Sequence, residues 1–263
     1  MALRQSAPGP LPGPGVPRPA PPSAAGRLGR LATTSAVRSQ RRVWSRRVDS
    51  WDHHTPSGLE KVTAAVLAHA TAGPGDQVVD LGCGTGQLSL PLAERGARVL
   101  AVDVSPAMVA RLEEKARERS LLGLEGLAAP IESLSLPAGS VDLVVSSYAL
   151  HHLRDADKER LVATAYHWLR PGGTLLIADM MFGRGGTRQD RVIIKSKVKA
   201  LASKGIGGWW RIAKNAYRYL VRVQERPVSI TAWTSMLGQA GFTSITASSI
   251  VAEAGLVCGR RPA

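Results

Sequence analysis

Cysteine and long apolar stretches are scarce in this chain. Only two of its 263 residues are cysteines, Cys83 and Cys258, which excludes a disulfide scaffold and makes a reducing, cytoplasmic compartment the expected location. No apolar run approaches the roughly 18 residues that a membrane-spanning helix needs, so such a helix is excluded. The length suits one large α/β domain or two small ones, each with a sizeable core.

The first 48 positions contain no acidic residue, so part of the chain's positive charge is concentrated there. Residues 1–48 contain nine arginines, and residues 183–226 contain twelve basic and two acidic residues. The rest of the chain carries a slight excess of acid, although the formal net charge is +14. Any contact with nucleic acid or with an anionic membrane should therefore use those two segments.

Residues 1–45 are predicted to be a disordered, basic, Pro/Arg-rich arm. Eight of the seventeen prolines fall within the first 22 positions, a density that opposes both a helix and a packed core. A mitochondrial transit peptide stays open as an alternative, since it would also be arginine-rich and acid-free, but it needs an amphipathic helix. The arm lacks the apolar core of a secretory signal.

Residues 46–263 are predicted to form one domain of alternating strands and helices. Strands expected at 77–81, 97–102, 124–128, 141–147 and 174–180 alternate with helices at 88–95, 106–119 and 155–169. Strands at 242–250 and 253–260 follow, joined by a short turn. The pattern predicts an α/β, Rossmann-like, doubly wound sheet of seven strands, mostly parallel with an antiparallel C-terminal strand.

The strongest signal for function is the segment VVDLGCGTG at 78–86. An apolar strand ends in an acid and enters a glycine loop that opens a helix, where free backbone N–H groups can face a ligand. The spacing is Gly-x-Gly-x-Gly, whereas a dinucleotide site has Gly-x-Gly-x-x-Gly. Asp103, at the tip of the next strand, can accept both hydroxyls of a ribose. Alone, it could equally be an acid at a helix N-terminus.

These residues resemble the class I S-adenosylmethionine-dependent methyltransferases, especially the small-molecule, ubiquinone/menaquinone-type subgroup. The resemblance rests on DLGCGTG at 80–86, Asp103, LRPGG at 169–173 and the terminal antiparallel strands. It covers 75–182 and, more loosely, 229–260. It implies transfer of a methyl group from S-adenosylmethionine to a small organic acceptor.

The resemblance also implies which residues bind the cofactor. The glycine loop would hold the methionine part, Asp103 the ribose, and the segments around 104 and 131 the adenine. The assigned residues are Asp80, Gly82, Cys83, Gly84, Gly86, Asp103, Val104, Ile131, Glu132 and Ser146. Pro130 departs from the family, because an acid that contacts adenine often stands there and proline offers neither a side-chain acceptor nor an N–H.

Catalytic candidates follow the fourth strand. His151 and His152 are candidates for a general base, because imidazole titrates near neutral pH, although either could instead pack beneath the next helix. Tyr148 and Asp179 end strands on the same side and are similar candidates, although Tyr148 could only line the pocket and Asp179 could be a helix cap or a structural acceptor. Methyl transfer depends largely on alignment, so a dedicated base need not exist. Cys83 lacks a basic neighbour in sequence and is expected to be a small loop residue.

Two further segments are expected to cover the site. Residues 51–54 precede the first helix and match a segment that folds over the cofactor in relatives; they could instead be a packing anchor. No metal is expected, because His53 and His54 lack a third ligand at usable spacing. Residues 183–228 are predicted to be a helical, basic insertion that acts as a lid.

The insertion leaves the acceptor and partners open. Its second helix has a basic stripe opposite an aromatic-rich apolar face, which favours an apolar or lipid-like acceptor and permits peripheral membrane contact through 189–223. A nucleic-acid methyltransferase is an alternative, disfavoured because SSYA at 146–149 replaces the motif of base-amino methyltransferases. A non-catalytic S-adenosylmethionine-binding partner protein is another. No sequence pattern indicates the oligomeric state.

Overall fold

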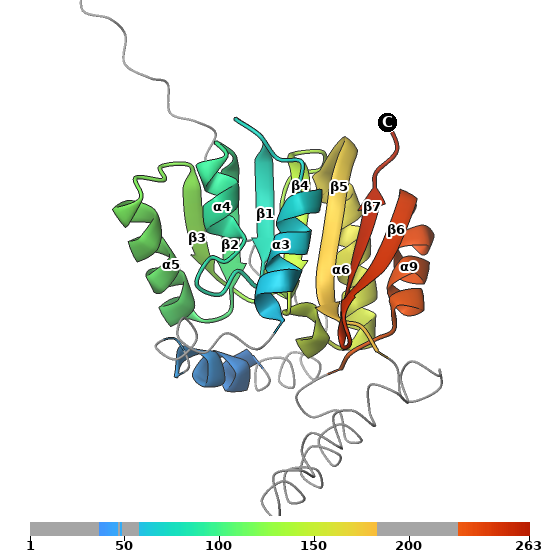
Figure 1. The fold of residues 1–263 in the computed structure, drawn as a ribbon, viewed down its shortest axis with the longest axis horizontal. Coiled ribbons are helices and arrows are strands. Elements are labelled where there is room, and N and C mark those ends of the chain that lie inside the picture. The colour runs from blue at the N-terminus through green and yellow to red at the C-terminus, as the bar shows by residue number, and fades with distance from the viewer. Residues whose placement is uncertain (1–36, 47, 49–57, 183–225) are drawn as a thin grey trace, which may run out of the picture.

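A seven-stranded sheet forms the centre of the molecule (Figure 1). The computed structural model describes residues 37–46, 48, 58–182 and 226–263. The strands are β1 (Gln77–Leu81), β2 (Arg98–Asp103), β3 (Leu124–Ala128), β4 (Val141–Ser147), β5 (Leu169–Met180), β6 (Thr243–Val251) and β7 (Ala254–Arg260). Their order is β3-β2-β1-β4-β5-β7-β6, with β7 antiparallel to both neighbours and β1 to β5 parallel. The predicted fold class is confirmed.

Helices cover both faces of this sheet. They are α3 (Leu59–His69), α4 (Ser89–Glu94), α5 (Pro106–Glu118), α6 (Asp155–Trp168) and α9 (Ile230–Gln239), with single 3-10 turns η1 (Ile131–Ser133) and η2 (Leu150–His152). Local sequence sets where some of them begin. Ser105 caps α5: its side chain accepts the N–H of Met108, and a proline stands at the first position of the helix. Ser229 caps α9 by accepting the N–H of Ala232.

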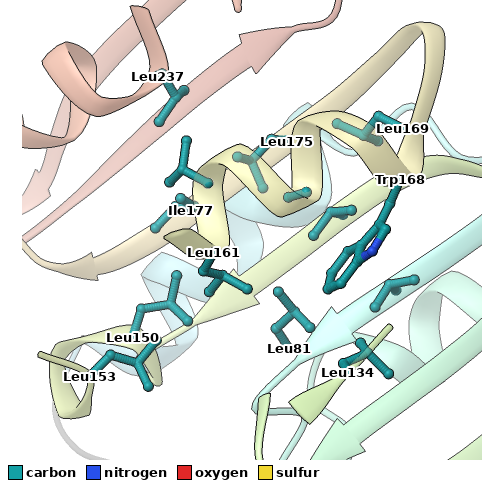
Figure 2. Packing of buried hydrophobic residues seen from close by; sticks show 14 of the residues in the cluster. Leu81, Leu134, Leu150, Leu153, Leu161, Trp168, Leu169, Leu175, Ile177 and Leu237 are labelled. Carbon is teal, nitrogen blue, oxygen red and sulfur yellow. The ribbon is translucent and has the colours of Figure 1, made fainter. Parts of the chain in front are cut away.

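Alternating strand residues divide the core between the two faces. Val79 and Leu81 of β1 join the cluster beneath α6 and α9, whereas Val78 belongs to the cluster beneath α3, α4 and α5. Figure 2 shows the first cluster, in which Trp168 lies among leucines from the central strands and α6. The two clusters fix the sheet between its helical layers, so the carboxyl ends of the parallel strands form one rigid edge.

Two boundaries differ by more than one residue from those predicted. Strand β5 begins at Leu169, ahead of the predicted start at 174, so Pro171–Gly173 lies within the strand, which pairs with β4 across a register shift. Residues 37–45, which fall within the predicted disordered arm of 1–45, are helical. We call residues 37–45 the N-terminal helix; Figure 1 draws it in blue beneath the strand ends.

Most of the predicted insertion, 183–225, lies outside the described residues, as do 1–36 and 49–57. The predictions of a lid, of a basic amphipathic helix and of an arm before residue 37 therefore stay predictions. Within the described ranges, no helix is both long and apolar enough to span a membrane.

Candidate functional site

A cavity opens at the carboxyl ends of the parallel strands, between the sheet and the N-terminal helix. Its volume is about 920 Å³ when the part open to solvent is included. It extends from the glycine loop and Asp103 to aromatic side chains on the opposite side. The lining residues are Val37, Gln40, Trp44, Leu59, Thr63, Asp80, Gly82, Cys83, Gly84, Gln87, Leu88, Asp103, Val104, Met108, Pro130, Ile131, Glu132, Ser147, Tyr148, Ala149, His152 and Leu153.

The glycine loop after β1 forms the floor of this cavity. The backbone N–H groups of Gly82 and Cys83 both donate to the carbonyl of Val102, which ties the loop to β2. Gly82 and Gly84 have φ angles of +80° and +53°, a region that side chains disfavour. The loop backbone can therefore lie directly along a bound molecule.

Asp103 is placed as the sequence predicts, at the tip of β2 and on the cavity wall. Its Oδ2 accepts the N–H of Gly84 at 3.0 Å, and its Oδ1 accepts the N–H of Ser105 at 2.8 Å. Burial raises the pKa of this carboxyl, and the two backbone bonds oppose the rise. A carboxylate has about four lone-pair positions, so capacity is left for a ligand's hydroxyls.

Asp80 and Cys83 lie deeper in the same wall. Asp80 accepts the hydroxyl of Ser89 at 2.5 Å, and its burial raises the pKa of this carboxyl to about 7. Burial and the two nearby carboxylates raise the pKa of the Cys83 thiol well above its usual value. The thiol is therefore neutral, which agrees with its interpretation as a small loop residue and not a nucleophile.

Gly86 and Ser146 do not line the cavity, unlike the other residues that the resemblance assigns to the cofactor. A Cβ on Gly86 would lie 2.3 Å from Leu112 Cδ1, so this glycine allows close packing of α5. Ser146 points into the sheet, where its Oγ donates to the carbonyl of Leu81 at 2.7 Å. The neighbouring Ser147 faces the cavity in its place, because successive strand side chains point to opposite faces.

An apolar slot lies beside Asp103. Val104, Met108 and Ile131 line it together with Pro130, at the position where the sequence departs from the family pattern. Glu132 is also on the lining, so a carboxylate is present near the slot despite the proline. Side chains of this kind can pack against the faces of a planar ring such as a purine.

The two adjacent histidines have different surroundings. His152 lines the cavity, where its ring lies edge-on to Trp44 with centroids 5.7 Å apart. His151 is buried and is not on the lining: its Nδ1 lies 2.6 Å from Oδ1 of Asp179. The geometry thus makes His152 the candidate base of the pair and supports the packing interpretation for His151.

Tyr148 lines the cavity with a backbone conformation that is rare for its type. Its φ is +51°, in the left-handed region, and its N–H donates to the carbonyl of Ala178. Burial, with contributions from Glu253 and Asp179, raises the pKa of Tyr148 to about 12. The phenol therefore keeps its proton at neutral pH and is a hydrogen-bond donor, not a base.

The N-terminal helix contributes residues that the sequence analysis missed. Val37, Gln40 and Trp44 line the cavity from one face of this helix, and Ser45 lies 2.9 Å, Oγ to Oγ, from the α5 cap Ser105. Their spacing of three and four residues is helical and could have identified the helix. The predicted covering segment 51–54 lies outside the described residues. Within the described part of the chain, no group of three or more His, Cys, Asp or Glu could hold a metal ion.

The fold and site together define a class I methyltransferase type of α/β protein, and comparisons with known proteins agree. A methyltransferase-domain family model matches residues 78–173. A protein of Oceanobacillus iheyensis named as an uncharacterized methyltransferase is 31% identical over 174 residues, 64% of this chain and 79% of that protein. Malonyl-[acyl-carrier protein] O-methyltransferase of Serratia marcescens is 34% identical over 144 residues, 54% of this chain and 52% of that protein.

The chain belongs to the S-adenosylmethionine-dependent methyltransferase family. A solved structure of Haemonchus contortus phosphoethanolamine N-methyltransferase 2, in complex with phosphomonomethylethanolamine and S-adenosylhomocysteine, has the same fold. The TM-score is 0.64 at 14% identity, over 83% of this chain and 58% of that one. The chain spans only 55 to 63% of the length of three further relatives, from two Geobacillus species and Synechocystis.

Proposed function

We propose that this protein transfers the methyl group of S-adenosylmethionine to a small, neutral and largely apolar organic acceptor. The observation that carries the proposal is a single cavity with two unlike ends. One end has a glycine loop and a carboxylate at the tip of β2, and the other has Trp44, Tyr148 and His152. Such a cavity can hold a nucleoside cofactor and a second molecule side by side.

The residues present fit the cofactor. Asp103 keeps hydrogen-bond capacity for ribose hydroxyls, and the backbone at Gly82 and Gly84 has no side chain to separate it from the methionine part. Val104, Met108 and Ile131 offer an apolar slot for the adenine. When bound, the cofactor supplies an activated methyl group on a sulfonium.

The chain's own contribution is to orient two molecules and to exclude water from between them, which can supply most of the acceleration of a displacement. His152 is the candidate proton acceptor for an acceptor that must lose a proton. Tyr148, with its proton retained, can donate a hydrogen bond to the acceptor.

The charge of the described lining supports a neutral acceptor. Its ionisable acids are Asp80, Asp103 and Glu132, and the described lining includes no lysine or arginine. A phosphate or free carboxylate on the acceptor would have no lysine or arginine partner among these residues. The aromatic rings with Val37 and Leu59 suit an apolar ring or chain.

Calorimetric titration with S-adenosylmethionine tests the cofactor half of the proposal. We expect saturable binding to the wild type and its loss in Asp103→Ala, with unchanged binding in the control Glu118→Ala, an exposed acid at the end of α5. A folded wild type that binds no S-adenosylmethionine would overturn the proposal.

A screen for release of S-adenosylhomocysteine tests the acceptor half. Neutral lipophilic acceptors should be turned over, and Trp44→Ala should raise their KM without weakening cofactor binding. Cofactor binding without turnover of any neutral acceptor would support the non-catalytic alternative. RNA or DNA binding that falls steeply with salt, together with methylation of that nucleic acid, would support the nucleic-acid alternative.

We also propose that residues 189–223 contact the membrane, which would bring a lipophilic acceptor to the site. These residues lie outside the part of the chain that the structure describes. The support for this contact is the basic, aromatic-containing sequence of the segment. Flotation with anionic and neutral liposomes tests it: binding to anionic vesicles alone is expected, and absence of binding to both would exclude it.

A further inference from the structure

His152 is carried by a short turn whose flanking residues are both held by buried charged side chains. We call residues 150–153 the histidine turn; it comprises η2 and Leu153. The N–H of Leu153 donates to the carbonyl of Leu150 at 3.0 Å, within the turn. The N–H of His152 donates to the carbonyl of Ala149, just before the turn, at 3.3 Å. One such turn does not fix a side chain by itself, so the contacts on either side of His152 matter.

On the N-terminal side, Asp179 at the end of β5 holds His151. Its Oδ2 accepts the backbone N–H of His151 at 2.7 Å, and its Oδ1 lies 2.6 Å from Nδ1 of the same residue. Asp179 is 1% exposed. This carboxylate therefore fixes both the backbone and the ring of the residue that precedes His152.

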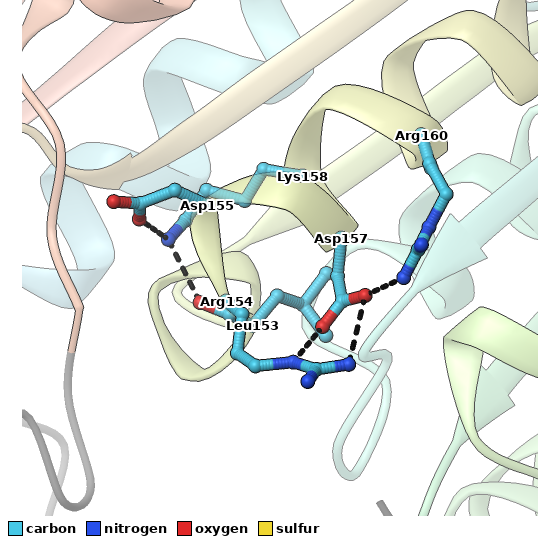
Figure 3. Close-up of polar contacts among 6 residues, drawn as sticks. All are labelled: Leu153, Arg154, Asp155, Asp157, Lys158 and Arg160. Carbon is cyan, nitrogen blue, oxygen red and sulfur yellow. Dashed lines mark hydrogen bonds and ion pairs between the residues drawn. The ribbon is translucent and has the colours of Figure 1, made fainter. Parts of the chain in front are cut away.

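On the C-terminal side, Lys158 of α6 holds Leu153 (Figure 3). Its Nζ donates to the carbonyl of Leu153 at 2.8 Å and to Oδ1 of Asp155 at 3.2 Å, and its side chain has no exposed area. Leu153 itself lines the cavity. The lysine therefore fixes the backbone of the residue that follows His152.

Arg226 joins the two anchors through its backbone. Its N–H donates to the carbonyl of His151 at 2.6 Å, and its carbonyl accepts from Lys158 Nζ at 2.6 Å. Residue 226 is where the described chain resumes after 182. Hydrogen bonds therefore connect the histidine turn to β5, to α6 and to the segment that precedes α9.

We propose that Asp179 and Lys158 are positioning residues that hold His152 in the cavity for methyl transfer. The inference rests on the proposed function, since it assigns His152 a role at the acceptor side. A buried ammonium is costly unless all of its protons are bonded, and an apolar residue of similar size is often as stabilising or more so. Here the three donors of Lys158 meet three oxygens. One is the carbonyl of Leu153, next to His152, and another is the carbonyl of Arg226, whose N–H donates to His151.

The lysine can be tested with Lys158→Met, which keeps the length of the side chain but removes its donors. The control is Leu237→Ala in α9, which also affects a fully buried side chain of the core but is not part of these contacts. Both variants are compared with the wild type well below their melting temperatures. Asp179→Asn tests the other anchor, because it keeps the size of the side chain and removes one acceptor.

Two measurements separate positioning from general destabilisation. In Lys158→Met and Asp179→Asn, kcat should fall by about tenfold to 100-fold, the scale expected when a reacting group is displaced by about 1 Å. The Kd for S-adenosylmethionine should stay unchanged, since Asp103 and the glycine loop do not contact either anchor. Leu237→Ala should lower stability and leave both constants unchanged.

The second measurement needs no activity. The ring C–H signals of His152 in NMR, assigned by their loss in His152→Asn, should shift or broaden in both anchor variants and not in Leu237→Ala. Unchanged His152 signals and unchanged kcat in a folded Lys158→Met protein would overturn the inference. A wild type without S-adenosylmethionine binding would overturn the proposed function, whereas the NMR comparison would still test the anchors.

Discussion

Gly82, after β1, lies directly against Ala149, after β4: a Cβ built on Gly82 would be 2.2 Å from the Cβ of Ala149. The two strands are neighbours in the sheet, and both residues line the cavity. The floor of the site is therefore formed where two loops approach more closely than any side chain at position 82 would allow. Cofactor binding and packing therefore both require glycine at position 82.

Gly82→Ala should abolish detectable S-adenosylmethionine binding and destabilise the fold by about 2–4 kcal/mol. The methyl group would both overlap Ala149 and force a side chain into a left-handed φ of +80°. Calorimetry and urea denaturation measure the two effects.

Gly75→Ala is the matched control for that substitution. Gly75 has a φ of +86°, almost the same as Gly82, but a Cβ there would meet nothing within 4 Å. Its cost should be limited to the backbone term of about 1–2 kcal/mol, with full cofactor binding. Equal losses in the two variants would show that the approach to Ala149 is unimportant.

Much of the sheet and its binding edge could be predicted from the sequence. Residues 124–128 and 141–147 match β3 and β4 at both ends, and Asp103 is at the predicted tip of β2. Apolar runs that alternate with helical patterns specify a parallel sheet, and ligands bind at the carboxyl ends of such strands. The position of the site therefore follows from topology, before any side-chain contact is known.

Side-chain direction could not be predicted in the same way. Ser146 and Ser147 differ by one residue at the end of β4, and only the second faces the cavity, because direction alternates along a strand. Lys158 lies in the charged sequence DADKER, which is typical of an exposed helix face, yet it is fully buried. Its acceptors include Arg226, which is distant in sequence, so no local pattern indicates the contact.

The pH dependence of stability should contain a contribution from Asp80. Burial raises the pKa of Asp80 from 3.8 to about 7, so the folded state holds this proton more tightly than the unfolded state does. Stability from this group is therefore greatest when it is protonated and falls as the pH rises from about 4 to about 7, by roughly 4 kcal/mol at most.

Asp80→Asn should remove that contribution. Asparagine can still accept the Ser89 hydroxyl but cannot ionise, so the variant should gain stability over the wild type as the pH rises through this window. Urea denaturation of both proteins without ligand, at several values from about pH 4 to about pH 8, measures the difference. A difference that does not change with pH would contradict a raised pKa for Asp80.

Arg261 should stabilise the C-terminal end of α6 without affecting the site. Its Nη1 donates to the carbonyls of Tyr166 and Leu169, and its guanidinium carbon lies 4.9 Å from the centroid of the Tyr166 ring. Arg261→Ala should lower the free energy of unfolding by about 2–3 kcal/mol, because helix-terminal carbonyls lose a charged donor.

Arg260→Ala is the control for Arg261, since the exposed Arg260 donates through Nε to the carbonyl of Gly172 at 3.0 Å. Its cost should be below about 1 kcal/mol. Both variants should bind S-adenosylmethionine as the wild type does, because neither arginine is on the cavity lining. Thermal denaturation and calorimetry measure the two quantities; weaker cofactor binding in Arg261→Ala would contradict the separation of the two regions.

Tyr148 should reveal its backbone strain when alanine and glycine replace it. Both substitutions remove the ring, but only glycine adopts a φ of +51° without strain. Tyr148→Gly should therefore be more stable than Tyr148→Ala by about 1 kcal/mol, the reverse of the usual order of these residues in ordered elements. Urea denaturation decides this, and a more stable alanine variant would show that the left-handed conformation relaxes.

Tyr148→Phe should separate hydrogen bonding from proton transfer, because phenylalanine keeps the ring and loses only the hydroxyl. The raised pKa of Tyr148, about 12, leaves the phenol protonated at neutral pH. The variant should therefore lose turnover while the pH dependence of kcat keeps its shape, whereas His152→Asn should remove one limb of that pH dependence. Stopped-time assays of S-adenosylhomocysteine release across pH make the comparison. If Tyr148→Phe removed that limb and His152→Asn kept it, the base would be the tyrosine.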